Sequence, residues 1–119
     1  MKTIEIIDPI ENKGRNRKFI VDADPHNDDS FVYLGAVVRD ENGSALRNAT
    51  VNITATDETQ NKIIESTGNQ KKAVIDGAKV ILPFYPYTYQ FRTAGKHTIT
   101  FECEGVTELV ELSAEDTLN

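Results

Sequence analysis

The chain has 119 residues, which suits a single domain, and its 39% apolar residues exclude an intrinsically disordered composition. Thirteen lysines and arginines against nineteen aspartates and glutamates give a formal net charge of -6 at pH 7. Because a negative protein repels phosphate backbones, these numbers argue against nucleic acid as a partner.

Cysteine usage and the first residues bear on where the protein acts. Cys103 is the single cysteine, so the fold must be stable without an intrachain disulfide. The first nine residues hold no long apolar run and no small-residue cleavage site, so we expect no signal peptide. No stretch approaches the length of a membrane span. We therefore expect synthesis in the cytoplasm and no membrane insertion.

Apolar residues recur at a spacing of two, and Gly, Asn, Asp and Pro interrupt them at short intervals. This pattern is typical of many short strands in a sandwich or barrel. Over the first 30 residues it predicts short strands at 3–7 and 18–22, a polar loop at 11–17 and an acidic loop at 22–30. We expect these 30 residues to form an extended N-terminal arm.

The strongest strand is predicted at 31–39, which is apolar on both faces, as a central strand would be. Asn42-Gly43 then predicts a turn, because both residues tolerate left-handed backbone angles. The segment 49–56 alternates cleanly between apolar and polar residues. It should point three apolar side chains inward: Val51, Ile53 and Ala55.

The second half of the chain continues the pattern. Within the polar stretch 57–72, two isoleucines predict a short edge strand, and an Asp-Gly pair predicts a hairpin between 73–75 and 78–84. A Glu-Gly turn separates the last two strands, at 96–103 and 106–112. The first of these should bury three alternate side chains: Ile99, Phe101 and Cys103.

These elements amount to about eight or nine short strands without an internal repeat. The sequence therefore predicts an all-β fold in three parts. The arm occupies residues 1–30, a β-sandwich occupies 31–113, and a flexible tail occupies 114–119.

Two segments resemble known modules. Residues 37–51, Val-Val-Arg-Asp-Glu-Asn-Gly-Ser-Ala-Leu-Arg-Asn-Ala-Thr-Val, look like the V-x-D-x-x-G-x-x-L-x-x-A-x-V hairpin of bacterial immunoglobulin-like (invasin-type) domains, and are similar to carboxypeptidase-regulatory-like modules. Residues 91–101 resemble the A-G-x-y-T-v-T approach to the penultimate strand of the invasin-like group. The resemblance spans roughly residues 31–112. It implies an immunoglobulin-like, Greek-key β-sandwich and supplies no catalytic residues.

Residue types that carry catalysis are sparse. The two histidines are His26 and His97, and we expect His97 on an exposed face before a strand. Cys103 should be buried and inert. The sequence lacks a Gly-x-Ser-x-Gly elbow, a His-Glu-x-x-His motif and a phosphate loop. These observations predict a protein that is not an enzyme.

The aromatic run at 83–91 is the most distinctive feature. Its two prolines favour an edge or a loop for at least its first part, and an extended chain would place its tyrosines on one face. Such a row could cover one end of the core, dock a protein or stack on sugar rings. The candidate partner-binding residues are Tyr85, Tyr87 and Tyr89.

Two charged clusters lie in the first 30 residues. Four positive charges form either a solvated loop or a surface for an acidic partner: Lys13, Arg15, Arg17 and Lys18. The carboxylates of the acidic loop form either a solvated turn or a calcium site: Asp22, Asp24, Asp28 and Asp29. Beyond this possible calcium ion we expect no cofactor.

Together these patterns predict a non-enzymatic structural or adhesive accessory module, with a phage or virion surface or tail as its favoured setting. One alternative is a domain of a multidomain bacterial surface adhesin, stiffened by calcium. Another is a carbohydrate-binding accessory domain. The expected partner is a protein or a particle surface, and homo-oligomers through an edge strand are also open.

Overall fold

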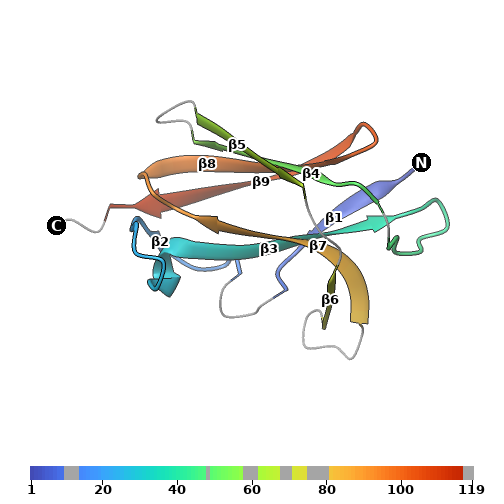
Figure 1. Ribbon diagram of the computed structural model, residues 1–119, viewed down its shortest axis with the longest axis horizontal. Helices are drawn as coiled ribbons and strands as arrows, with labels where there is room; N and C mark the ends of the chain where they lie inside the picture. The colour runs from blue at the N-terminus through green and yellow to red at the C-terminus, as the bar shows by residue number, and fades with distance from the viewer. Residues whose placement is uncertain (10–13, 48, 58–61, 68–70, 75–80, 117–119) are drawn as a thin grey trace.

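The computed structural model describes residues 1–9, 14–47, 49–57, 62–67, 71–74 and 81–116. These residues form an all-β sandwich of two sheets (Figure 1). The first sheet has four strands in the order β1 (Thr3–Ile7), β3 (Phe31–Arg39), β7 (Ile81–Gln90) and β6 (Lys71–Val74). The second has five in the order β2 (Phe19–Ile20), β9 (Val106–Glu115), β8 (Gly95–Cys103), β4 (Asn52–Asp57) and β5 (Lys62–Thr67).

Most of the expected strands are confirmed. β1 and β3 have the predicted bounds, and β5 lies at an edge of its sheet, next to β4. The turn at Asn42-Gly43 is also confirmed, since Gly43 has a φ of 84° and the Asp40 carboxylate accepts bonds from two backbone amides of the turn. However, β3 and β4 belong to different sheets, so this connection crosses the sandwich. The Asp-Gly hairpin expected at residues 76 and 77 lies outside the described residues.

The core follows from the alternation of side chains along the strands. β4 and β8 direct their predicted apolar residues inward, and all of them are at most 1% exposed: Val51, Ile53, Ala55, Ile99, Phe101 and Cys103. β3 is buried continuously from Leu34 to Val38. β1 and β7 flank it, and the second sheet covers the face that carries Leu34, Ala36 and Val38. On the other face, Val37 packs with Ile7, Phe84 and Ala45. Burial of these side chains is the main driving force for closing the sandwich.

The structure differs from the expected division at residue 31. β1 is a strand of the first sheet, whereas β2 runs parallel to β9 in the second. Phe19 is 1% exposed, and its ring centroid lies 4.8 Å from that of Phe91. The described part of residues 1–30 is therefore built into both sheets, because its alternate apolar side chains complete the core.

The C-terminal end also differs from its expected form. β9 continues to Glu115, and Ala114 is 4% exposed and belongs to the core. The predicted tail at 114–119 therefore begins inside a strand, while residues 117–119 lie outside the described part. The cause is β2, whose pairing with Ala114 and Glu115 extends the sheet.

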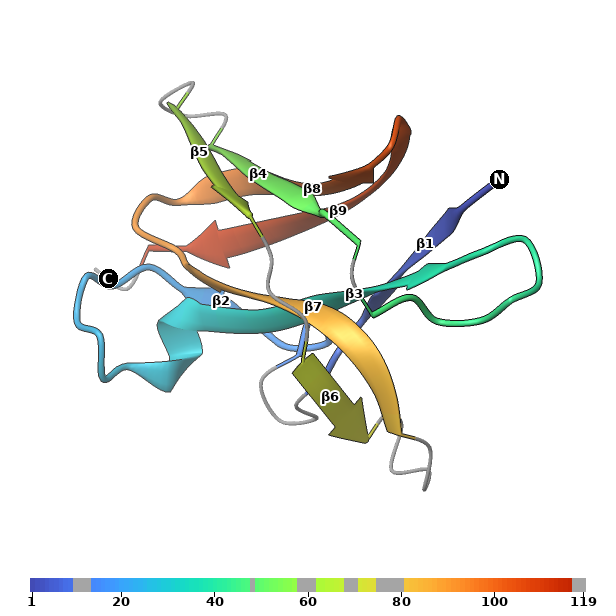
Figure 2. The ribbon, with the colours of Figure 1, turned by 45° about the vertical axis from the view of Figure 1, so that its right-hand side comes forward.

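β7 contains both prolines of the aromatic run, whose first part is expected at an edge or in a loop. The first half of β7, as far as Phe84, pairs with β6. Its second half, from Tyr85 onward, pairs with β3 (Figure 2). Pro83 and Pro86 stand on either side of this change of partner. Because they are three residues apart, their nitrogens face opposite sides of the strand, and each can face the side without a partner strand.

The burial of Phe19 gives a direct test of this fold. Phe19→Ala should lower the free energy of unfolding by about 3–5 kcal/mol, because it removes a large side chain from the core. Ile20→Ala, at the neighbouring half-buried position in the same strand, should lower the free energy of unfolding by about 1 kcal/mol. Urea unfolding of both variants measures the difference, and equal losses would contradict the packing of Phe19.

Candidate functional site

The tyrosines proposed as a docking row face the interior of the sandwich. Tyr85 is 1% and Tyr89 6% exposed, and Tyr87 is half-buried with its ring 6.2 Å from that of Tyr89. The Tyr85 hydroxyl donates to the Leu46 carbonyl at 3.1 Å and accepts from the Ala49 amide at 2.8 Å. It thereby anchors the connection from β3 to β4. Tyr85 and Tyr89 therefore cover the core, while the Tyr87 side chain stays partly exposed.

Tyr89 belongs to a buried polar network that the sequence did not reveal. Its hydroxyl lies 2.8 Å from His97 Nδ1, and His97 Nε2 lies 2.8 Å from the Thr93 carbonyl oxygen. That oxygen can only accept, so Nε2 carries the proton and Nδ1 accepts from Tyr89 in neutral His97. The Thr93 hydroxyl donates to the buried Asp57 carboxylate.

The exposed position expected for His97 was wrong. His97 lies within β8 and is 1% exposed, and the rings of Tyr89 and Phe91 pack against it at interplanar angles of 62° and 87°. Its place in the inward register of β8, two residues before Ile99, was the available signal. The network links the turn after β7 to the end of β4.

The basic residues of the predicted docking surface hold the N-terminal segment in place. Arg15 pairs with Asp8 at 3.1 Å and donates to the Ile6 carbonyl at 3.1 Å. Lys18 forms an exposed ion pair with Glu115 at 3.1 Å. Lys13 lies outside the described residues. The cluster is therefore divided among separate contacts to the rest of the sandwich.

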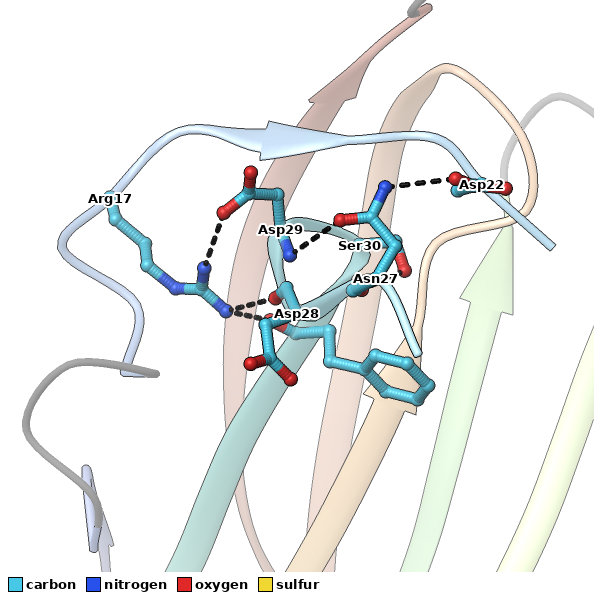
Figure 3. A network of polar contacts seen from close by, with 7 residues as sticks. Arg17, Asp22, Asn27, Asp28, Asp29 and Ser30 are labelled. Atoms are coloured by element: carbon cyan, nitrogen blue, oxygen red, sulfur yellow. Dashed lines mark hydrogen bonds and ion pairs between the residues drawn. The ribbon is translucent and has the colours of Figure 1, made fainter. Parts of the chain in front are cut away.

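Arg17 makes the most extensive of these contacts. Its guanidinium donates to the carbonyl oxygens of Asp28, at 2.9 Å, and Phe31, and approaches the Asp29 carboxylate at 3.6 Å (Figure 3). It also lies over the Phe19 ring at 5.0 Å. One side chain thus connects β2, the short 3₁₀ turn η2 (Asp28–Ser30) and the start of β3.

The acidic loop folds through bonds between its own side chains and backbone. Asp22 accepts from the Asp24 amide at 3.0 Å and from the Asn27 side chain at 2.8 Å, while Asn27 accepts from the Asp29 amide at 3.1 Å (Figure 3). The bond from Asn27, followed by that from the Asp24 amide, lowers the pKa of Asp22. These are the Asx turns that Asp and Asn favour in loops.

The four candidate calcium ligands are used separately. Asp22 and Asp24 accept backbone amides within the loop, Asp29 faces Arg17, and Asp28 binds Arg17 through its carbonyl oxygen. Within the described ranges, no three acidic, histidine or cysteine side chains converge in a way that would hold a metal ion. Nor does any helix of this part have the length and apolar character needed to cross a membrane.

A concave surface lies at the end of the sandwich that holds the N-terminus. It has a volume of about 490 Å³, and its lining residues are Lys2, Leu46, Arg47, Ala49, Thr50 and Glu104. Lys2 and Glu104 form an ion pair across it. No sequence pattern predicts this site, because its residues come from three distant segments and carry no shared motif.

Comparison with known proteins adds little to this geometry. No family model matches the chain, and no curated protein matches it. Among solved structures, the chain is similar to a copper-bound variant of FetP from uropathogenic Escherichia coli strain F11. The identity is 13% and the TM-score 0.47, over 93% of this chain and 85% of that one. So weak a likeness does not bear on function.

The Tyr89 hydroxyl gives the buried network a measurable pH signature. Burial, followed by the nearby charge of Asp57 and by Tyr87, raises the pKa of Tyr89 from 10.0 to about 12. Between these values the folded state keeps a proton that the unfolded state has lost, so the free energy of unfolding should fall as the pH rises from about 10 to 12.

Tyr89→Phe should remove the part of this alkaline decline that comes from Tyr89. At pH 7 it should also lower the free energy of unfolding by about 1–3 kcal/mol, because it leaves His97 Nδ1 buried without a donor. Tyr87→Phe is the control for the loss at pH 7, since the Tyr87 hydroxyl makes no hydrogen bond to another described residue. Burial also raises the pKa of Tyr87, so the alkaline decline of Tyr89→Phe is compared with that of the unmodified protein. Urea unfolding between pH 7 and 12 measures both effects. The same alkaline decline in Tyr89→Phe as in the unmodified protein would contradict the assignment.

Proposed function

We propose that this protein is a non-enzymatic structural or adhesive accessory module with an immunoglobulin-type, Greek-key sandwich, acting on a virion or cell surface. The strand order supports the fold type. The order β1-β3-β7-β6 follows the A-B-E-D sheet of immunoglobulin domains, and β9-β8-β4 follows G-F-C. β5 stands where variable-type domains add strand C′.

The observation that carries the proposed role is the path of the chain through the molecule. The sandwich measures 50 × 31 × 18 Å, and Figure 1 places the start of β1 and the end of β9 toward opposite ends of the long axis. A module with this geometry transmits a load along its strands when it is attached at both ends. The same geometry suits a particle appendage and a domain of a multidomain adhesin.

The use of reactive side chains agrees with a non-enzymatic role. Cys103 is buried, and both ring nitrogens of His97 have partners within the core network. The aspartates of the acidic loop support its own turns. In the described ranges these side chains stabilise the sandwich itself. The faces, edges and ends of the sandwich therefore remain for binding a partner.

The direction of loading provides the experiment. Pulling residues 1 and 116 apart would shear β1 against β3 and β9 against its neighbours, so many hydrogen bonds resist at once. Handles at Asn42 and Glu104, which lie at the same end, would instead separate strands from their tips. Single-molecule force measurements on a Cys103→Ser background should give a higher unfolding force for the end-to-end geometry.

Complete unfolding between residues 1 and 116 should release a single extension of roughly 330–370 Å, from the extended length of these residues less that of the folded module. An end-to-end unfolding force equal to or below that of the same-end geometry would contradict a role in transmitting tension along the strands. Turnover of an ester, phosphate or glycoside substrate that is lost in His97→Gln would contradict the non-enzymatic role.

A further inference from the structure

In the part of the chain that the structure describes, the outer edge of β9 has a partner strand only near its C-terminal end. β9 pairs with β8 along nine consecutive positions, whereas β2 pairs with its other edge at Ala114 and Glu115. Along 106–113, no described strand forms a ladder with that edge, although β1 of the other sheet passes close to β9. Five of these eight side chains are exposed, and Leu109, at 55%, is an exposed large apolar residue in the middle of the strand. Such an edge is a template for another strand.

The turn between β8 and β9 determines which backbone groups point outward. Glu104 and Gly105 have φ values of 50° and 83°, as in a two-residue type I′ hairpin loop. Such a loop makes Cys103 and Val106 a hydrogen-bonded pair, so the even-numbered residues of β9 bond to β8 and the odd-numbered ones face away. The bond from the Val21 amide to the Glu115 carbonyl, at 2.9 Å, agrees with this parity.

We propose that two copies of this chain associate through the free edges of β9, in an antiparallel register centred on Leu109. A two-fold axis then passes beside Leu109, so that Leu109 of one copy pairs with Leu109 of the other, and Thr107 pairs with Glu111 in both directions. All of these residues have the odd parity that leaves their amide and carbonyl groups free. Two five-stranded sheets become one continuous sheet of ten strands.

The charge pattern selects this register over its neighbours. Centred on Leu109, each Glu108 lies opposite Val110 and each Glu111 opposite Thr107, so no like charges face each other directly. A register centred on Glu108 or on Glu111 would place a glutamate opposite its own copy. A register centred on Val110 would place Leu109 opposite Glu111. The Leu109-centred register is the one of these that brings the exposed leucines together.

This association does not depend on the proposed role, since it follows from the edge of β9 alone. Its test is the solution mass and the amide hydrogen exchange of the complete chain, measured from micromolar to millimolar protein. We expect a dimer with twice the chain mass of 13.3 kDa. The amides of Thr107, Leu109 and Glu111 should be protected in the dimer and exchange rapidly on dilution. The amides of Glu108 and Val110 should stay protected throughout, because they bond to β8.

Leu109→Glu should raise the dissociation constant by about tenfold or more, because it places two carboxylates opposite each other and removes the apolar contact. Thr88→Glu is the matched control, since it adds the same charge at an exposed position on the other sheet and should leave the dimer intact. Urea unfolding confirms that both variants fold. A monomer at millimolar concentration would overturn the proposal, and so would a dimer that persists in Leu109→Glu.

Discussion

The fold depends on the insertion of Phe19 between the two sheets. The chain begins in the first sheet with β1, and β2 then joins β9 in the second, with Phe19 packed against Phe91 in the shared core. Arg17 stabilises this crossing, because its guanidinium lies over the Phe19 ring and bonds to carbonyls at the start of β3. A short segment of about twenty residues thereby ties both sheets together along one side of the sandwich.

This constraint also accounts for the contacts that the conspicuous charges and rings of the sequence make. A sandwich has to pair most of the polar groups that its connections bury, and within the described residues Arg17 Nε is a buried side-chain atom left without a partner. Arg15, Arg17 and the acidic loop provide such pairing for the N-terminal crossing, and Tyr85 does so for the connection from β3 to β4. In the described part of the chain, the faces, edges and ends of the sandwich remain for binding, and there the transmission of tension and the β9 pairing are proposed.

Alternation of apolar residues was enough to predict the fold class and most strands, because side chains in a two-layer fold must point alternately inward and outward. It placed β3 and the inward residues of β4 and β8 correctly. It could not show which strand pairs with which, so β1 and β2 were assigned to an arm. Composition also could not tell a buried tyrosine row from an exposed one, since the same period of two serves both faces. The network around His97 joins β4, β7 and β8, and a pattern within one segment does not predict contacts among three strands.

The central claim is that the N-terminal segment is part of the sandwich, and deletion tests it most directly. A chain that starts at Asp22 lacks β1, β2 and Phe19 but keeps the other seven strands. Urea unfolding followed by circular dichroism should show no cooperative transition for this shortened chain, because the core is open on one side. A cooperative transition with the midpoint of the complete protein would contradict the account and make residues 1–21 a separate arm.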